Sequence, residues 1–540
     1  MREWWRDAVI YQVYPRSFQD TSGNGVGDLQ GIIKRLPHIA ALGADCVWLS
    51  PFLTSPQKDM GYDVSDYCDV DPLFGSLADF DALIAAAHDL GLKVIMDQVI
   101  SHSSDKHPWF EESRKDTTNP KADWYVWADP LPDGSPPNNW ASVFGGPAWE
   151  YEPRRKQYYM HNFLIEQPDL NMHNAEVQDA MLSALRFWLD RGVDGFRLDT
   201  ANYFFHDPQL RVNPPATAAD FAMASGTYGM QKHLYDRTRP ENLPFLERLR
   251  ALTDEYDDRM MVGEIGEDGH RSIEVMAEYT EGNSRLHMAY SFAMLGPQYS
   301  AGHFRRCIEG FREGAPNGHP KWSFSNHDVP RHAGRWADHA EGDTDAIARQ
   351  AAMMLMSFPG TIGIYQGEEL GQIDTELFFE ELTDPPAIRY WPAEKGRDGC
   401  RTPMVWERNA PNAGFSDSKP WLPVKPPQAA RAVDVQEASD GSLLHHYRAV
   451  IAARRASPVL REGDIAFHDL PEPMLAFTRS IGEAGMTCVY NLGPTPVALT
   501  LGGPAEITGP SFASLDGKAL GLPGNGYVWL SHSGALQLSV

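Results

Sequence analysis

The sequence predicts an α/β fold, a (β/α)8 or TIM barrel, with a small domain inserted after the third strand and an antiparallel β domain at the C-terminal end. Three observations lead to this prediction. Helical and strand patterns alternate along most of the 540 residues, one long stretch rich in proline, asparagine and aromatic residues interrupts them, and short alternating segments follow residue 458. Strands that alternate with helices are typical of βα units and a parallel sheet.

Eight barrel strands can be assigned. In the first units, apolar residues keep helical spacing from Leu29 to Leu42 before Gly43, and Ser76 with Asp79 forms the capping-box pattern that begins the next helix. The apolar runs between such helices are expected to be buried strands. These runs are Val9–Tyr14, Cys46–Pro51, Lys93–Val99, the run that ends at Asp199, the run that ends at Glu264, Leu286–Phe292, Trp322–Asp328 and Ile362–Gln366.

We expect the barrel to comprise residues 1–102 and 172–457. The interruption after the third strand, residues 103–171, is too long for a loop and should form a small domain of its own. Residues 458–540 contain short alternating segments punctuated by glycine and proline, for which we expect a C-terminal β-sandwich.

The composition of the chain indicates which binding partners and which cellular compartment to expect. The chain has 47 basic and 73 acidic residues, a formal net charge of −26, which disfavours nucleic acid or an anionic membrane and suits a small neutral ligand. Its five cysteines lack CxxC spacing, so neither a zinc site nor a disulfide framework is predicted, and a reducing compartment is expected. No signal-peptide pattern and no apolar run of about 18 residues occurs. We therefore expect a cytoplasmic monomer or small homo-oligomer.

Chemically active side chains stand at the C-terminal edges of several predicted strands. Asp199 ends the fourth strand and Glu264 the fifth, each after an apolar run. The C-terminal ends of barrel strands form one mouth, so these carboxylates should lie together there with His102, His327 and Asp328. Two carboxyl groups at one site are the minimum for glycoside hydrolysis.

Four motifs fall at these strand ends: Asp97–His102, Gly195–Asp199, Val262–Glu264 and Ser325–Asp328. Together they resemble glycoside hydrolase family 13, the α-amylase family, over essentially the whole chain. One motif alone would be a weak signal, but four in order are specific. Further segments resemble the α-glucosidase and oligo-1,6-glucosidase branch, which acts mainly as exo-enzymes on small α-glucosides; they are Tyr14–Phe18, Gln167–Asn171, Tyr365–Glu369 and Arg401–Met404.

The resemblance implies that Asp199 is the nucleophile, Glu264 the acid/base, and Asp328 the carboxylate that holds the sugar 2- and 3-hydroxyls. A retaining glycosidase needs the first two carboxyl groups about 5 to 5.5 Å apart. Arg197 lies two residues before Asp199 on the same face of the strand, and we expect it to lower the pKa of the nucleophile. Burial and nearby negative charge are expected to keep Glu264 protonated near neutral pH.

By the same resemblance, Tyr62 stacks on the sugar ring, and Asp59 pairs with Arg397 to close the pocket floor, so that only a non-reducing end enters. His102 and His327 are expected to donate neutral hydrogen bonds to hydroxyl groups, although a histidine after a barrel strand is more often a structural hydrogen-bonding residue. The remaining wall residues implied by the family pattern are Phe144 and Phe163.

No organic cofactor is expected, but one loop favours a structural Mg²⁺ or Ca²⁺ ion. Ser101 replaces the calcium-binding Asn of the endo-acting amylases of the family, so that calcium site is not expected here. Loop 20–28 alternates oxygen-bearing residues with glycines, which allows a tight wrap around a hard cation. Relatives carry Asn and Asp at Ser22 and Asn24, so weaker binding or an empty loop stays open. The predicted ligands are Asp20, Ser22, Asn24, Val26 and Asp28.

Two features bear on specificity. Thr200 follows the nucleophile, and in relatives of this branch Val at this position accompanies α-1,6 activity, whereas Ala or Thr accompanies α-1,4 activity. The segment Tyr235–Asn242 follows strand four, where the family builds its aglycone side. It either narrows the acceptor site towards disaccharides or is a solvated charged loop.

The predicted function is that of a retaining exo-acting α-glucosidase, which hydrolyses maltose-like disaccharides and short oligosaccharides with α-1,4 preference through a covalent glucosyl-enzyme. Transglucosylation, or isomerisation of sucrose or trehalose, at the same site stays open, because the sequence does not set the partition between water and other acceptors. A non-catalytic scaffold is the remote alternative, disfavoured because Asp199, Glu264 and Asp328 are all retained.

Overall fold

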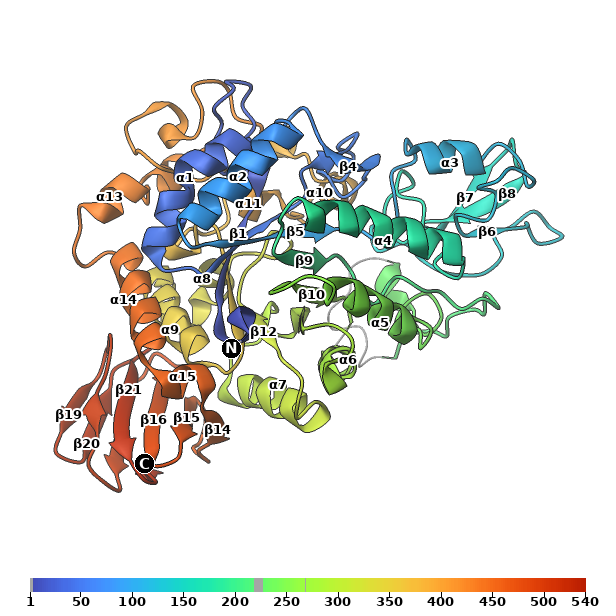
Figure 1. Ribbon diagram of the computed structural model, residues 1–540. Coiled ribbons are helices and arrows are strands. Elements are labelled where there is room, and N and C mark those ends of the chain that lie inside the picture. The colour runs from blue at the N-terminus through green and yellow to red at the C-terminus, as the bar shows by residue number, and fades with distance from the viewer. Residues whose placement is uncertain (1–2, 218–226, 268) are drawn as a thin grey trace.

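The computed structural model describes residues 3–217, 227–267 and 269–540, and it confirms the predicted fold class (Figure 1). Eight parallel strands in these ranges form the barrel. They are β1 (Val9–Val13), β2 (Cys46–Leu49), β5 (Lys93–Gln98), β9 (Gly195–Leu198), β10 (Met260–Ile265), β11 (Met288–Ser291), β12 (Lys321–Ser323) and β13 (Thr361–Tyr365). Their order is β11-β10-β9-β5-β2-β1-β13-β12, and a backbone bridge between Ala289 and Pro320 nearly closes the sheet.

Helices follow the strands and surround the sheet (Figure 1). The predicted capping box is present, formed by Ser76 and Asp79 at the start of α2 (Leu77–Asp89). At the start of α1 (Leu29–Leu42), Asp28 accepts from the Gly31 N–H, a cap that was not predicted. The longer helices are α1 (Leu29–Leu42), α2 (Leu77–Asp89), α4 (Ala175–Asp190), α5 (Asn242–Thr253), α6 (Gly269–Thr280), α7 (Ala301–Gly314), α9 (Thr344–Ser357) and α14 (Leu443–Ala456). The shorter ones are α3 (Pro108–Ser113), α8 (His332–Arg335), α10 (Pro385–Tyr390), α11 (Asp398–Arg401), α12 (Pro426–Ala429), α13 (Val433–Glu437) and α15 (Pro458–Glu462).

The segment between β5 and α4 has a sheet of its own, which lies beside α4 in Figure 1. This three-stranded antiparallel sheet has the order β6 (Trp127–Ala128), β8 (Gln157–Met160) and β7 (Trp149–Glu152). Trp140 and Trp149 belong to a buried cluster there. A separate two-stranded sheet, β3 (Leu53–Thr54) with β4 (Asp66–Val70), follows the second barrel strand.

The C-terminal strands form two antiparallel sheets. One has the order β14 (Asp464–Phe467), β15 (Met474–Ile481), β16 (Ala484–Asn491), β21 (Tyr527–Ser533) and β18 (Glu506–Ile507). The other has the order β19 (Ser514–Asp516), β20 (Ala519–Leu522), β17 (Val497–Leu501) and β22 (Leu538–Ser539). Val489 and Val528 of the first sheet share a buried cluster with Leu499 and Leu520 of the second, so the two sheets pack face to face.

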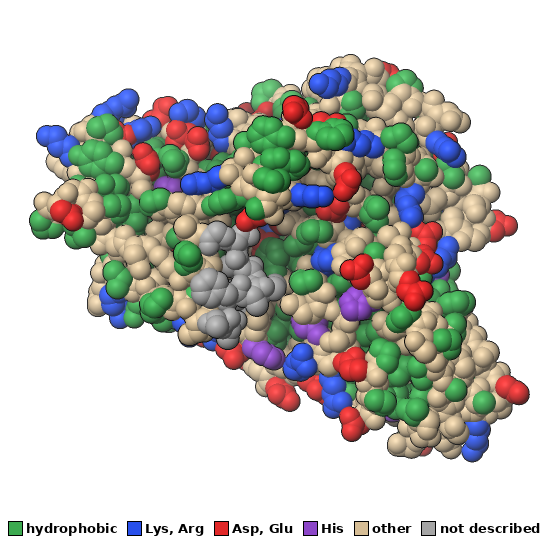
Figure 2. Space-filling model, turned by 180° about the vertical axis from the view of Figure 1, so that it is seen from behind, with side chains coloured by type: hydrophobic (Ala, Val, Ile, Leu, Met, Phe, Trp, Pro, Cys, Tyr) green, Lys and Arg blue, Asp and Glu red, His purple; other side chains and the backbone are tan. Residues whose placement is uncertain are grey.

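The surface carries both signs of charge. Figure 2 shows acidic and basic side chains interspersed over one face, which is hollowed near its centre. Among the helices of the described ranges, none combines the length and the apolar character needed to cross a membrane.

Gly195, at the N-terminal end of β9, tests how tightly β9 and β10 pack. A Cβ atom there would lie 2.1 Å from the Met260 carbonyl oxygen, which belongs to the backbone of β10 and moves only with the sheet. We expect Gly195→Ala to lower the free energy of unfolding by about 1–3 kcal/mol, measured as a lower midpoint in scanning calorimetry. Gly441→Ala is the control, since a Cβ there meets open space, and should change stability by no more than about 0.5 kcal/mol. Equal midpoints for the two variants would contradict the argument.

Candidate active site

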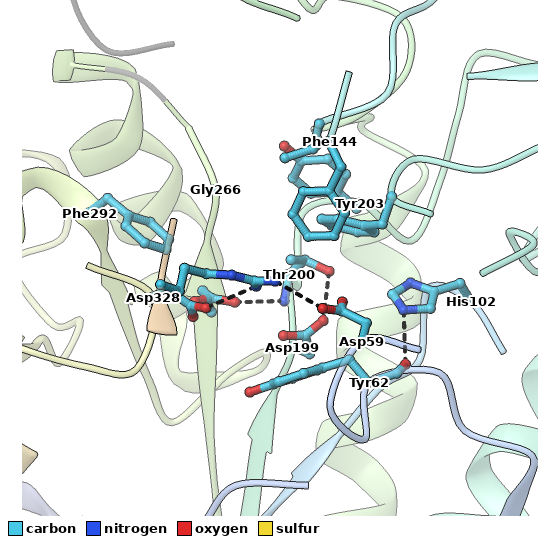
Figure 3. Close-up of a pocket in the computed structure, with 14 residues that line it drawn as sticks. Asp59, Tyr62, His102, Phe144, Asp199, Thr200, Tyr203, Gly266, Phe292 and Asp328 are labelled. Carbon is cyan, nitrogen blue, oxygen red and sulfur yellow. Dashed lines mark hydrogen bonds and ion pairs between the residues drawn. The ribbon is translucent and has the colours of Figure 1, made fainter. Parts of the chain in front are cut away.

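A pocket opens where the barrel strands end (Figure 3). Its cavity volume is about 200 Å³, below the roughly 300–1,000 Å³ of pockets for drug-sized ligands, so a small ligand suits it best. The lining residues are Asp59, Tyr62, His102, Val143, Phe144, Phe163, Asp199, Thr200, Tyr203, Glu264, Gly266, Phe292, Asp328 and Arg397.

One buried guanidinium, that of Arg197 on β9, contacts three carboxyl groups. Its Nη1 donates to Asp97 Oδ1 (2.6 Å) and to Asp199 Oδ1 (2.7 Å), and its Nη2 lies 2.6 Å from Glu264 Oε2. The register explains this contact: Arg197 pairs with Val262 of β10, so Glu264, two residues further on, projects to the same side. Because Asp199 and Glu264 contact the same guanidinium, their carboxyl groups lie close together.

Burial has the largest effect on the pKa of Asp199. Burial raises the pKa of this carboxyl, Arg197 lowers it, and the negative charges of Asp97 and Asp328 raise it again, with a net value of about 6. The sequence-based expectation of a lowered pKa was therefore wrong in its net direction. Arg197 acts in the expected sense, but desolvation outweighs it. Above pH 6 Asp199 is nonetheless mainly ionised.

Glu264 keeps its proton to a higher pH than Asp199. Burial raises the pKa of Glu264, Arg197 lowers it and Asp199 raises it, with a net value of about 7. Its Oε1 accepts a hydrogen bond from the Tyr290 hydroxyl (3.1 Å), whose oxygen accepts from Arg197 Nε (3.1 Å). Tyr290 is the residue of β11 that pairs with Glu264 across the sheet. Glu264 is thus held by Arg197 and Tyr290, which also contact each other.

Thr200 contacts both carboxyl groups. Its backbone N–H donates to Glu264 Oε2 (3.2 Å), and its hydroxyl donates to Asp199 Oδ2 (3.3 Å). Its φ of 37° lies in the left-handed region, which is unusual for a β-branched residue and costs about 1–3 kcal/mol. This strained backbone directs the Thr200 N–H towards Glu264.

A second arginine, Arg397, forms a charged wall of the pocket. The expected pairing with Asp59 is present, with Arg397 Nη2 2.9 Å from Asp59 Oδ1. The same Nη2 lies 2.7 Å from Asp384 Oδ1, and Nη1 lies 3.3 Å from Asp328 Oδ1. Gln167 Nε2 donates to the other oxygen of Asp59 (3.1 Å). Arg397 thus links Asp59 and Asp328, both of which are labelled in Figure 3.

Asp328 is ionised. Burial opposes its charge, but His327, Arg401 and Arg397 together hold the pKa of Asp328 below its usual range. Arg401 Nη2 donates to Asp328 Oδ1 at 2.9 Å. A carboxylate kept charged in a buried wall accepts strong hydrogen bonds from hydroxyl groups.

The two predicted histidines are buried and neutral. Burial lowers the pKa of His102 to about 3 and that of His327 well below its usual value. Gln12 Nε2 donates to His327 Nδ1 (2.8 Å), which leaves the proton on Nε2, 2.6 Å from the Tyr62 hydroxyl and 3.2 Å from Asp328 Oδ2. His102 Nε2 lies 3.2 Å from the Tyr62 carbonyl oxygen. Both rings therefore act as neutral hydrogen-bonding groups.

The structure brings the predicted catalytic and sugar-binding residues together, although Arg197 and His327 lie beneath the pocket surface rather than in its lining. Sequence reasoning gave no role to several further residues at or behind the pocket, among them Asp97, Tyr203, Tyr290, Phe292, Asp384 and Arg401. Asp97 and Arg401 stood in matched motifs and could have been found. Asp384 and Tyr290 carry no signal in their own segments.

The segment Tyr235–Asn242 contacts the pocket wall. Arg237 is buried, and its Nη1 donates to the hydroxyls of Tyr203 and Tyr228, each at 2.7 Å. Tyr203 itself lines the pocket. Of the two interpretations of this segment, the solvated charged loop is wrong for Arg237.

The candidate metal loop is closed by its own hydrogen bonds. Asp20 accepts from the N–H groups of Gly23 and Gly25 and from the Ser22 hydroxyl, at 2.8, 2.8 and 3.2 Å, and Asp28 accepts from the Thr21 and Ser22 N–H groups at 2.9 and 3.0 Å. In the structure both carboxylates are thus occupied by hydrogen-bond donors of the loop and of Ser416. Across the part of the chain that the structure describes, no group of three or more His, Cys, Asp or Glu side chains is placed to hold a metal. The cation therefore stays a prediction.

Comparisons with known proteins point to the family whose motifs occur at this site. The sequence matches the family model described as "Alpha amylase, catalytic domain" over residues 12–463. A probable α-glucosidase of Rhizobium meliloti (strain 1021) is 56% identical over 496 residues, which cover 91% of this chain and 90% of the relative. An oligo-1,6-glucosidase of Heyndrickxia coagulans is 35% identical over 541 residues, which cover 92% and 94% of the two chains.

A solved structure is similar throughout. The crystal structure of an α-glucosyl transfer enzyme superimposes with a TM-score of 0.95 at 52% sequence identity, covering 98% of this chain and 100% of that one. Family model, relatives and fold point to the same group. The chain is a glycoside hydrolase that belongs to family 13, the α-amylase family, in its α-glucosidase and oligo-1,6-glucosidase branch.

Proposed function

We propose that the protein is a retaining, exo-acting α-glucosidase that releases glucose from the non-reducing end of maltose-like disaccharides and short α-1,4-linked oligosaccharides. The contact of Asp199 and Glu264 with one guanidinium carries the proposal. Pairs that act by retention lie close together, whereas inverting pairs are about 6.5–9.5 Å apart to admit a water molecule. With pKa values of about 6 and about 7, one carboxyl is ionised while the other is protonated between those values.

The reaction has two steps. First, the Asp199 carboxylate bonds to the anomeric carbon while Glu264 gives its proton to the glycosidic oxygen, so the C–O bond breaks and the aglycone leaves as an alcohol. Then the Glu264 carboxylate takes a proton from water, the water oxygen bonds to the anomeric carbon, and Asp199 departs as a carboxylate. The proton balance returns both groups to their starting states.

We assign the other pocket residues to the terminal glucose. Asp328 and His102, an ionised acceptor and a neutral ring of the pocket lining, hold its hydroxyl groups, whereas His327, which lies beneath the lining, positions Asp328 and Tyr62. Tyr62 stacks on the ring. The Asp59–Arg397 pair closes the floor, which makes the enzyme exo-acting. The walls are Phe144 and Phe163.

Transfer of glucose to an alcohol is the second candidate activity. The 52% identity to an α-glucosyl transfer enzyme favours it. So do Tyr203 and Phe292, aromatic side chains of the pocket that offer apolar surface to an acceptor. Both activities pass through the same glucosyl-enzyme and differ in the molecule that reaches it.

We further propose that the protein acts in the cytoplasm, as a monomer or small homo-oligomer, on small α-glucosides and without nucleic acid or membrane partners. The five cysteines are all free thiols in the structure, which suits a reducing compartment.

The pH dependence of kcat/KM tests the assignment of roles. We expect a bell-shaped profile for maltose with limbs near pH 6 and pH 7, the pKa values of Asp199 and Glu264. Below the acidic limb Asp199 is protonated and does not attack, and above the alkaline limb Glu264 has lost the proton that it must donate. Because the two carboxyl groups interact, each limb reports a titration of the pair rather than of one residue alone. A profile that is flat from about pH 5 to about pH 9 would contradict the proposal.

Substrate range is measured by incubating the protein separately with maltose, isomaltose, sucrose, trehalose and starch and resolving all sugars formed. We expect glucose chiefly from maltose. Asp199→Ala, checked for native circular dichroism, should lower kcat by about 10⁴-fold or more. New linkages would make the protein a transferase, and no turnover of any sugar would refute a glucosidase.

Thr200→Val extends this measurement to linkage preference. The substitution keeps the shape of the side chain but removes the hydroxyl that donates to Asp199. We expect the ratio of kcat/KM for maltose to that for isomaltose to fall about tenfold, the scale at which small changes of pocket shape discriminate. An unchanged ratio would remove the basis for the α-1,4 preference.

Thermal denaturation tests the structural cation that we propose at loop 20–28. We expect millimolar Ca²⁺ or Mg²⁺ to raise the unfolding midpoint relative to a chelator, by an amount equivalent to about 2.7 kcal/mol at a hundredfold excess over Kd. Asp20→Ala should have a lower midpoint that no longer responds to either ion. Equal midpoints of the wild type with cation and with chelator would refute the site.

A further inference from the structure

Lys321 is a buried lysine in the interior of the barrel that the proposed reaction does not use. It begins β12 and is 2% exposed. Its Nζ donates to Ser323 Oγ at 2.9 Å and lies 4.2 Å from the ring centroid of Tyr290 and 4.9 Å from that of Trp48. An ammonium group at these distances from ring faces makes cation–π contacts with both.

The fold leaves room for this side chain. Gly363 on β13 pairs with Ser323, and a Cβ atom on Gly363 would lie 2.3 Å from Ser323 Oγ and 2.7 Å from Lys321 Nζ. A larger residue at position 363 would therefore displace the ammonium group. The absence of a side chain on the neighbouring strand keeps Lys321 under the two rings.

Both rings connect Lys321 to the carboxyl groups of the site. The Tyr290 hydroxyl donates to Glu264 Oε1 at 3.1 Å, and the Trp48 indole N–H donates to Asp97 Oδ2 at 3.2 Å. A cation close to the face of a phenol or an indole makes its O–H or N–H a stronger donor, because it withdraws electron density. Lys321 thus adds positive charge next to Tyr290 without being part of the pocket lining.

Charged groups of several elements act on Lys321. They are Arg197 of β9, Glu264 of β10, Asp97 of β5 and Glu368 of the short 3-10 helix Glu368–Leu370, and Tyr290 of β11 is the titratable ring in contact. Burial and Arg197 lower the pKa of Lys321, and the three carboxyl groups raise it, with a net value of about 7. Lys321 and Glu264 therefore titrate in the same pH range and influence each other.

We propose that Lys321 is a positioning residue for Glu264, which fixes Tyr290 against that carboxyl group and supplies a positive charge that favours its ionised form. The inference rests on the proposed role of Glu264 as acid/base. Its consequence is that Glu264 gives up its proton more readily in the first step and recovers the carboxylate needed to activate water in the second. Lys321 itself touches neither the pocket nor the substrate.

The test compares pH profiles of kcat/KM for Lys321→Met and Lys321→Gln with that of the wild type, using maltose. Removing the positive charge should raise the pKa of Glu264, so the alkaline limb should move to higher pH by about half a unit in both variants. Ser323→Ala is the matched control, because it removes the hydrogen-bond partner and keeps the ammonium group, and its limb should stay at the wild-type position. Lys321→Gln retains a polar group towards Ser323 in case the Met variant is poorly folded.

A lower unfolding midpoint with an unmoved alkaline limb in both Lys321 variants would show that the lysine only fills space, and would overturn the proposal. A limb that moves equally in Ser323→Ala would also overturn it, since the charge is intact there. A glucoside of a strongly acidic phenol tests Glu264 separately, because such a leaving group departs without a proton. If the wild-type alkaline limb is the same with this substrate and with maltose, the proposed role of Glu264 fails, whatever Lys321 does.

Discussion

The site depends on one buried cation. Arg197 is fully buried, and an unpaired guanidinium in that position would cost several kcal/mol. Asp97, Asp199 and Glu264 compensate its charge, each from a different strand or strand end. The ion pairs that make the arginine tolerable are therefore the contacts that hold the proposed nucleophile and acid side by side. The same ion pairs of Arg197 therefore contribute both to stability and to the arrangement of the two carboxyl groups.

Arg397 has a comparable environment with a different result. It contacts Asp59, Asp384 and Asp328. The pKa values of Asp384 and Asp328 are lowered, whereas burial raises that of Asp59. Two guanidinium groups, Arg397 and Arg401, act on Asp328, whereas Asp199 has one. The second guanidinium thus helps to keep Asp328 ionised, whereas the pKa of Asp199 is about 6.

The part of the site that follows from barrel topology could be predicted from the sequence. Carboxylates at the ends of parallel strands must meet at one mouth, so Asp199 and Glu264 could be placed together before any coordinates. Asp384 could not be placed in the site from the sequence, because its contact with Arg397 depends on the path of an irregular segment. Tyr290 required the register of β10 with β11. The net pKa of Asp199 depends on burial, which no local motif encodes, and that is why the expected direction was wrong.

The small difference between the pKa values of Asp199 and Glu264 affects both proposed steps of the reaction. With values of about 6 and about 7, about 0.6 of the molecules carry the productive combination at the best pH. A higher pKa for Glu264 would raise that fraction, but it would make Glu264 a weaker acid and slow the transfer of its proton to the glycosidic oxygen. A lower pKa would weaken the carboxylate as a base towards water or another acceptor in the proposed second step, where the same group acts as base. The positive charges of Arg197, which contacts Glu264, and of Lys321, which contacts Tyr290, hold the pKa of Glu264 between these demands. We infer that the balance between forming and resolving the glucosyl-enzyme is set from inside the barrel rather than from the pocket.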